Sequence, residues 1–381
     1  MTPNDPLFIG VNDHDIDLFE GQFKVPNGMS YNSYVIADEK IAVMDSVDAH
    51  FSREWLGNLK QALSGKQPDY LIVHHMEPDH SGSILQFMEA YPNATIVTNN
   101  KGAAMMMNFF GTNFDERCLL VKNGDELSLG SQSLTFIFAP MVHWPEVMMS
   151  YNNGTKTLYS ADAFGKFGAL DTDEEWAHEA RRYYFGIVAP YGKQVQALLK
   201  KVATFDIKAI CPLHGPMLYH DLASYLSLYE TWSSYESECD GVVIAYASVY
   251  GHTKKAAEDL AALLKQRGTT VALYDLERCD QAAVISDAFR YKTLVCASMT
   301  YNGSLFPAMR NFLHELVEKK YQKRHVAFIQ NGAWAPMATK AMKGLLEACA
   351  DLSFVEDEVT ITGALDGSSQ AELEALATAL T

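Results

Sequence analysis

Several common features are missing from this 381-residue sequence. Its six cysteines form no C-x-x-C pair, so neither a rubredoxin-type iron centre nor an iron-sulfur cluster is indicated. No run of about 18 or more apolar residues occurs. The N-terminus, Met1-Thr2-Pro3-Asn4-Asp5, lacks the basic start and apolar core of a signal peptide. We therefore expect a soluble, cytoplasmic protein with reduced, packed thiols.

Basic residues are also scarce, because 30 Lys and Arg stand against 47 Asp and Glu, giving a formal net charge of -17. This balance argues against a nucleic-acid-binding surface, since a basic patch would act against the field of the whole chain. The length and the 48% hydrophobic content predict two domains, because a single core rarely extends over so many residues.

The densest group of potential metal ligands follows the apolar run 70–73, which we interpret as a buried strand. The run continues into His74-His75-Met76-Glu77-Pro78-Asp79-His80-Ser81-Gly82, after which a helix is predicted to begin. In α/β folds, functional groups gather in such loops at the carboxyl ends of strands. The imidazoles and carboxylates at positions 75, 77, 79 and 80 could hold a metal pair, although acidic and histidine residues are also common in exposed loops.

Later segments repeat this pattern, because each follows a strand-like run and contains a ligand-type residue. His143 lies in residues 140–145, Asp162 in 159–165 and His214 in 211–215. Mixed carboxylate and imidazole ligands favour iron or manganese over the His-rich or thiolate sets typical of zinc.

The second half of the sequence follows a polar break at residues 236–241 and alternates strands with helices. Strands are predicted at 242–246, 293–297 and 325–329, and this alternation indicates a doubly wound parallel sheet. We place the domain boundary between Glu238 and Cys239. The first half mixes βα units with hairpins such as 33–44, which fits two sheets flanked by helices.

Loops at the predicted strand ends of the second half mix glycine with hydroxyl, amide and aromatic side chains. The loop 247–257 enters a helix near Thr253 and offers backbone amides and a positive helix end to a phosphate. An ordinary N-cap by Ser248 or Thr253 is the alternative. The loops 298–303 and 330–334 could enclose a planar ring. Neither G-x-G-x-x-G nor a Walker lysine motif occurs, which disfavours a dinucleotide or a nucleoside triphosphate.

The order H-x-E-x-D-H, followed by a distant His, Asp and His, resembles the metallo-β-lactamase-like fold, with Glu77 where its zinc hydrolases place His. The later loops resemble flavodoxin, with S-x-x-G-x-T beginning at Ser248. Together with the HWPE segment at 143–146, nearly the whole chain resembles a flavodiiron protein, also called an A-type flavoprotein. The resemblance implies a metallo-β-lactamase-like αββα sandwich at residues 1–238 and a flavodoxin-like, FMN-binding doubly wound parallel sheet at 239–381.

The resemblance also implies two iron ions and one FMN per chain. One iron would be held by His75, Glu77 and His143, and the other by Asp79, His80 and His214, with Asp162 bridging. Whether His80 ligates stays open, because some family members leave that imidazole off the metal. The implied flavin contacts are Ser248, Val249, Tyr250, Gly251, His252, Thr253, Met299, Thr300, Tyr301, Asn302, Gly303, Asn331, Gly332, Ala333 and Trp334.

The implied activity is reduction of dioxygen to water, of nitric oxide to nitrous oxide, or of both, with electrons relayed through FMN. The sequence ends at Thr381 without a rubredoxin domain, so we expect a separate donor, either a rubredoxin or a reduced deazaflavin coenzyme. A head-to-tail homodimer or homotetramer is implied, because flavin and irons on separate sheets of one chain would lie too far apart. No nucleic acid or membrane partner is expected.

Two other functions remain open at this stage. One is a binuclear metallohydrolase fused to a flavodoxin domain, acting on a thioester, lactone or phosphodiester; Glu77 argues against it. The other is a flavodoxin-like electron carrier whose first domain serves only for docking.

Overall fold

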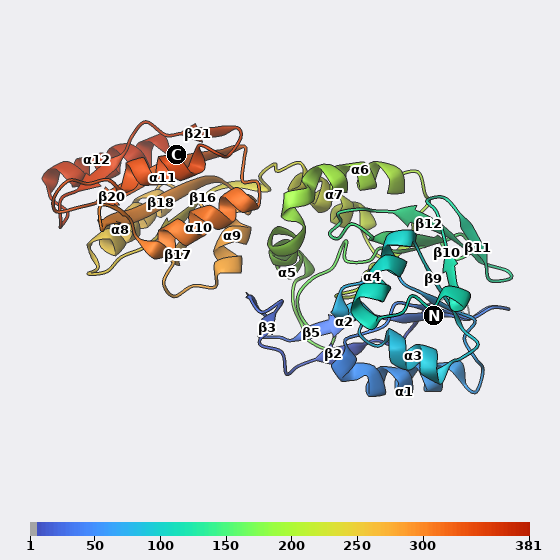
Figure 1. The fold of residues 1–381 in the computed structure, drawn as a ribbon. Helices are drawn as coiled ribbons and strands as arrows, with labels where there is room; N and C mark the ends of the chain where they lie inside the picture. Colours follow the sequence, from blue (N-terminus) through green and yellow to red (C-terminus); the bar gives the residue numbers. More distant parts are fainter. Residues whose placement is uncertain (1–5) are drawn as a thin grey trace. The chain divides into compact units, whose positions relative to one another are not determined.

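The computed structural model of the protein describes residues 6–381. Packing divides the chain into two compact units, and Figure 1 shows their elements. The first unit contains residues up to Tyr183 together with Lys193–Glu230, and the second contains Tyr184–Gly192 together with Thr231–Thr381. Within the described part of the chain, no helix combines the length and apolar character needed to cross a membrane.

The first unit is built on two sheets that enclose an apolar core between them. In the six-stranded sheet the order is β1 (Leu7–Phe8), β6 (Tyr34–Ile36), β7 (Ala42–Met44), β8 (Tyr70–Ile72), β9 (Thr95–Thr98) and β10 (Cys118–Leu120). In the five-stranded sheet the order is β11 (Glu126–Ser128), β12 (Ser133–Phe138), β13 (Met148–Asn152), β14 (Thr157–Tyr159) and β15 (Ala209–Cys211). Two small ribbons pair β2 (Val11–Asp13) with β5 (Met29–Tyr31) and β3 (Leu18–Phe19) with β4 (Phe23–Lys24).

Helices complete the first unit, and α7 runs across the division between the units. These helices are α1 (Ser52–Leu63), α2 (Pro78–Ser81), α3 (Ile84–Ala90), α4 (Asn100–Phe110), α5 (Trp176–Tyr183), α6 (Gly192–Val202) and α7 (Leu222–Ser233). Short helical turns lie at η1 (Ala49–Phe51) and η2 (Asp115–Arg117) in the first unit, whereas η3 (Tyr184–Val188) and η4 (Ala189–Tyr191) belong to the second.

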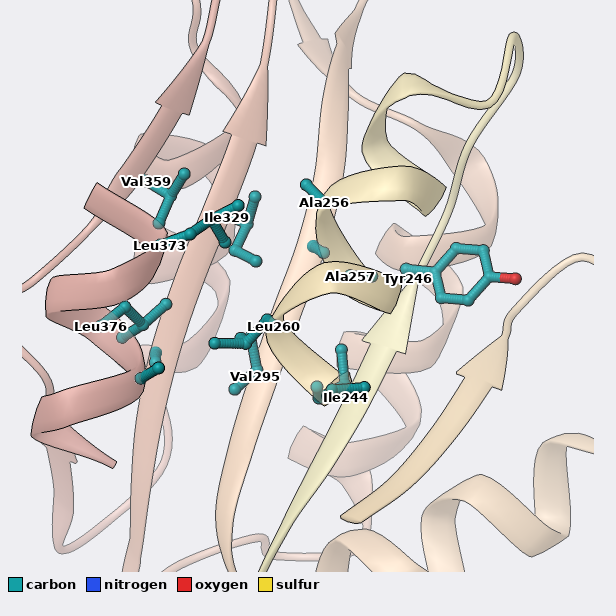
Figure 2. Close-up of a cluster of buried hydrophobic side chains, with 14 of the residues drawn as sticks. Ile244, Tyr246, Ala256, Ala257, Leu260, Val295, Ile329, Val359, Leu373 and Leu376 are labelled. Carbon is teal, nitrogen blue, oxygen red and sulfur yellow. The ribbon is translucent and has the colours of Figure 1, made fainter. Parts of the chain in front are cut away.

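The second unit is a parallel sheet ordered β17, β16, β18, β20, the doubly wound arrangement that the alternating sequence predicted. Figure 2 shows Leu260 of α8 and Leu376 of α12 packed over one face, close to Val295 and Ile329. Its strands are β16 (Cys239–Tyr246), β17 (Val271–Asp275), β18 (Tyr291–Tyr301), β19 (Ser304–Leu305), β20 (Arg324–Asn331), β21 (Leu352–Phe354) and β22 (Val359–Ile361). Its helices are α8 (His252–Gln266), α9 (Gln281–Arg290), α10 (Pro307–Glu318), α11 (Ala338–Leu346) and α12 (Gly367–Ala379).

One local expectation needs correction. The first histidine-rich motif was predicted as a loop with a helix beginning after it, but residues 78–81 already form the short helix α2. Pro78 occupies its first turn, where the missing N–H costs nothing and the fixed φ suits a helix. As a result, Asp79 and His80 are presented from a helical turn.

The segment that joins the units packs with the second one. The guanidinium of Arg324, only 2% exposed, donates to six backbone carbonyl oxygens, including Tyr235 at 2.6 Å and Tyr291 at 2.9 Å. The boundary predicted between Glu238 and Cys239 therefore falls inside the second unit by packing, and it stays a prediction of where an independently folding domain begins.

Candidate metal centre and flavin site

All of the predicted metal ligands come together in the first unit, in two neighbouring clusters. In the first cluster, the Glu77 Oε2 atom lies 3.2 Å from His75 Nε2 and 3.1 Å from His143 Nε2. In the second, the Asp79 Oδ2 atom lies 3.3 Å from His80 Nε2 and 3.2 Å from His214 Nε2. Metal–ligand bonds of about 2.0–2.2 Å place neighbouring ligand atoms about 3 Å apart, so both clusters have the dimensions of a coordination shell.

Asp162 lies between the two clusters and faces both. Its Oδ2 atom is 2.9 Å from His143 Nε2 and 3.4 Å from His75 Nε2. Its Oδ1 atom is 3.3 Å from His80 Nε2. The residue is fully buried, and Oδ1 has no hydrogen-bond partner among the described residues. A carboxylate that offers one oxygen to each cluster has the geometry of a bridging ligand.

The clusters form because different strands end at the same place. His75 and Glu77 follow β8, and α2 supplies Asp79 and His80. The other ligand-type residues come from the opposite sheet, where Asp162 follows β14 and His214 follows β15. Strands β14 and β15 are parallel neighbours, so their carboxyl ends deliver these two residues side by side.

Outer hydrogen bonds fix the orientation of two imidazoles. The Nδ1–H of His75 donates to Glu146 Oε1 at 2.7 Å, and the Nδ1–H of His214 donates to the Ser30 carbonyl at 2.7 Å. Each bond leaves Nε2 free to face the cluster, which is the usual arrangement around a protein metal site. Neither Glu146 nor Ser30 was predicted as a site residue. The HWPE segment contains Glu146, but its role as a partner of His75 becomes visible only in the folded chain.

The electrostatics of the clusters also fit metal ions. Burial lowers the pKa of His143, but hydrogen bonds with Asp162 and Glu77 outweigh it and raise that pKa to about 9. Burial raises the pKa of Asp162, yet the charge of His75 and the imidazole hydrogen bonds hold it well below its usual range. The buried Asp79 carboxylate and His80 Nδ1 have no hydrogen-bond partner within residues 6–381. Without a metal, protons on the imidazoles would have to supply the positive charge that balances these closely spaced carboxylates.

Two further polar residues, His74 and Glu20, belong to neither cluster. His74 bonds Asp45 through Nδ1 at 2.5 Å and Ser150 through Nε2 at 2.8 Å, so it is a satisfied core histidine. Glu20, in the turn between β3 and β4, is exposed as a residue. Partial burial of its carboxyl and then the charge of Glu77 raise its pKa. Sequence patterns gave no sign of Glu20, because nothing near it resembles a ligand motif.

A cavity of about 290 Å³ in the second unit gathers residues from all of the predicted flavin loops. Of the predicted contacts, Gly251, Asn302 and Gly303 are not part of its lining, whereas Gly363, which was not predicted, is. Gly363 follows β22 and exchanges two hydrogen bonds with the side chain of Asn331. Its strand is short and was not recognised in the sequence. The lining residues are Ser248, Val249, Tyr250, His252, Thr253, Met299, Thr300, Tyr301, Asn331, Gly332, Ala333, Trp334 and Gly363.

The loop after β16 fits the phosphate of FMN. Gly251 takes φ of 91°, a conformation that glycine adopts without steric cost, and it caps the N-terminus of α8. The Ser248 hydroxyl accepts a hydrogen bond from Gly251 N–H at 3.2 Å. The N-cap residue of α8 makes no side-chain capping bond, which leaves backbone amides of the first turn available to donate to an anion. Tyr250 and Trp334 are 91% and 83% exposed, so the cavity has aromatic side chains available to face a flavin ring.

One acidic residue borders this loop. The backbone N–H of Ser248 donates to Glu277 Oε1 at 3.1 Å. Burial and a hydrogen bond with Asp275 raise the pKa of Glu277 to about 7. The carboxyl is therefore largely neutral below pH 7 and charged above it, close to the loop that is predicted to bind a phosphate.

We predict that FMN affinity falls as pH rises through about 7, because ionised Glu277 repels the phosphate. The variant Glu277→Gln keeps an acceptor for Ser248 and loses the charge. Its dissociation constant should match the wild-type value at pH 6 and be roughly two- to fivefold lower at pH 8, the range expected for an exposed charge pair. Quenching of FMN fluorescence by apoprotein measures both constants. Riboflavin, which lacks the phosphate, is the control ligand, and equal FMN constants at pH 8 would contradict the prediction.

Comparisons with known proteins agree with this arrangement. The profile of the ODP family beta lactamase matches residues 29–215, and that of a flavodoxin domain matches residues 243–369. An uncharacterised protein of Methanocaldococcus jannaschii is 31% identical over 364 residues, covering 93% of this chain and 91% of that protein. The anaerobic nitric oxide reductase flavorubredoxin of Vibrio vulnificus is 28% identical over 347 residues, covering 87% of this chain and 69% of that protein.

Among solved structures, rubredoxin oxygen:oxidoreductase from Desulfovibrio gigas superposes with a TM-score of 0.90 and 26% identity, covering 98% of this chain and 95% of that one. The fold is thus a metallo-β-lactamase-like unit followed by a flavodoxin-like unit, with FMN and a pair of irons as the cofactors of the class. The chain belongs to the flavodiiron proteins. Its relatives include oxidoreductases.

Proposed function

We propose that this protein reduces dioxygen to water, nitric oxide to nitrous oxide, or both. The position of Asp162 carries this proposal, because its oxygens face two clusters that each contain carboxylate and imidazole groups. Such a set suits a pair of irons better than a pair of zinc ions. Glu77 in the first cluster supports an oxidoreductase over the alternative metallohydrolase.

In the proposed centre, His75, Glu77 and His143 would hold one iron, Asp79, His80 and His214 would hold the other, and Asp162 would offer one oxygen to each. The inclusion of His80 follows from its Nε2 atom, which lies 3.0 Å from His214 Nε2 and faces the same cluster. When bound, the irons and FMN supply electrons to a diatomic gas. The chain itself orients the imidazoles through Glu146 and the Ser30 carbonyl, and burial of the clusters keeps bulk water away.

The remaining partners belong to the same proposal. An external donor, a rubredoxin or a reduced deazaflavin coenzyme, would supply electrons to bound FMN. Because the flavin cavity and the metal clusters belong to different units, we propose a head-to-tail homodimer or homotetramer in which the FMN of one copy serves the irons of another. A cytoplasmic location stays a prediction from the sequence.

Gas pulses on reduced protein test the proposal directly. Purified protein is reduced without oxygen and then given dioxygen or nitric oxide, while the flavin spectrum and the products are followed. We expect each gas pulse that is consumed to reoxidise FMN and to form water or nitrous oxide. Iron and FMN contents are measured in the same sample.

A protein that contained zinc and hydrolysed a thioester, lactone or phosphodiester would instead support the metallohydrolase. If the flavin were reoxidised equally fast after removal of the metals, the electron-carrier function would be supported. A rate equal to that of free FMN with either gas would contradict the proposed reductase.

A further inference from the structure

The loop that presents Asp162 has an unusual backbone conformation. Ala161 and Phe164, on either side of it, have φ of 49° and 68°. Positive φ is uncommon for residues with a side chain, and for a bulky residue such as Phe it persists only where the surroundings impose it. Something outside the local sequence must therefore stabilise the loop.

Most backbone hydrogen bonds of this loop stay within it or reach the adjacent chain before His214. Gly165 N–H donates to the Asp162 carbonyl at 3.0 Å, and Leu213 N–H donates to the Ala161 carbonyl at 2.9 Å. The side chain of Ser160 donates to the Ala163 carbonyl at 2.7 Å. These bonds tie the loop to the segment that carries His214, but none of them involves the amide of Phe164.

The amide of Phe164 is bonded from farther away, by Tyr229 of α7. Phe164 N–H donates to the Tyr229 hydroxyl oxygen at 2.5 Å. The two rings also stack, with centroids 4.2 Å apart and planes inclined at 29°. Both residues are 1% exposed, so water cannot replace the hydroxyl as acceptor. Tyr229 thus contacts Phe164 through both its amide and its ring, at a residue with unfavourable φ.

We infer that Tyr229 is a positioning residue of the metal centre, which holds the loop 160–165 so that Asp162 presents one oxygen to each cluster. This inference rests on the bridging role of Asp162 in the proposed function. Loss of the hydroxyl leaves a buried N–H without an acceptor, and rotation of that peptide toward ordinary φ is the simplest relief. Because Asp162 is separated from Phe164 by a single residue, the same rotation displaces its carboxylate.

The variant Tyr229→Phe tests the inference, because it keeps the ring stack and deletes the acceptor. Metal-depleted variant and wild type are titrated with Co²⁺, whose ligand-field absorption reports the coordination geometry. We expect Co²⁺ affinity to fall about 10- to 100-fold, the range typical of lost outer contacts at metal sites, and the ligand-field bands to shift. FMN content should stay unchanged, since the flavin loops belong to the other unit.

Tyr151→Phe is the matched control, because Tyr151 is 3% exposed and its hydroxyl makes a part-buried hydrogen bond to the Asp206 carbonyl at 2.9 Å, away from the metal clusters. Wild-type affinity and bands in Tyr229→Phe would overturn the inference, and so would equal Co²⁺ losses in both variants, which would indicate general destabilisation.

A second measurement, amide hydrogen exchange, needs no variant. In metal-depleted wild type, peptides covering residues 160–165 should exchange amide hydrogens slowly, and rapid exchange would overturn the inference.

The proposed gas reduction and the positioning role of Tyr229 can fail independently of each other. If wild type binds the Co²⁺ pair and Tyr229→Phe weakens it, yet the iron-loaded protein reduces neither gas, the proposed function fails and the positioning role stands. If the gases are reduced but Tyr229→Phe leaves Co²⁺ binding unaltered, the positioning role fails alone.

Discussion

Asp162→Asn should lower gas consumption by at least about 100-fold, beyond the range typical of changes around the outer contacts of a metal site. The substitution keeps the shape of the side chain and removes its charge. One of the two oxygens becomes an NH₂ group, which cannot donate electrons to a metal. Whichever way the amide turns, that group faces Nε2 of His80 or the Nε2 atoms of His75 and His143. Oxygen- and nitric oxide-electrode traces with a chemical reductant give the rates.

The control for this variant is Asp206→Asn, which changes an exposed carboxylate paired with Lys208 at 3.0 Å. It should consume gas at the wild-type rate. FMN content of Asp162→Asn should also be normal, because the flavin cavity lies in the second unit. Iron content below that of wild type, together with intact FMN, would locate the defect at the metal centre. Full gas consumption by Asp162→Asn would show that a carboxylate at this position is not required for the activity.

The parts of the fold that follow from local patterns were predicted well. The hairpin in residues 33–44 forms as β6 and β7, and the alternation after residue 241 forms the parallel sheet. The predicted ligands converge because each one follows a strand end, and strand ends are readable from apolar runs. The flavin loops follow the same rule, which is why all three contribute residues to one cavity.

The parts that were missed depend on contacts between distant residues. Glu146 reaches His75 across the two sheets, and Tyr229 reaches Phe164 from a helix much later in the chain. Neither residue sits in a pattern that distinguishes it from ordinary polar or aromatic packing. Arg324 is a similar case, because an arginine that follows Lys323 at the start of a strand has the pattern of an ordinary exposed basic residue. Such residues become recognisable only when the atoms that they bond are known.

Arg324→Met should destabilise the second unit by about 3–5 kcal/mol, because several buried carbonyl oxygens lose their donor at a cost of about 1–3 kcal/mol each. The guanidinium is 2% exposed and donates to carbonyls of the segment joining the units, of α9 and of the chain just before β20. Methionine fills similar volume but donates no hydrogen bond, so these buried carbonyl oxygens lose their partner. Urea unfolding, followed through release of FMN fluorescence, should show a lower midpoint than wild type.

Arg267→Met is the matched control, since that guanidinium lies at the surface and bonds the side chains of Thr378 and Glu374. Its cost should stay below about 1 kcal/mol, as for most exposed ion pairs. The contrast separates burial from charge, because both variants lose one arginine. If Arg324→Met unfolded within 1 kcal/mol of Arg267→Met, the carbonyls around Arg324 would have to find water or other donors. The segment 231–238 would then owe its place in the second unit to apolar packing, such as that of Trp232 against Tyr184 and Phe185.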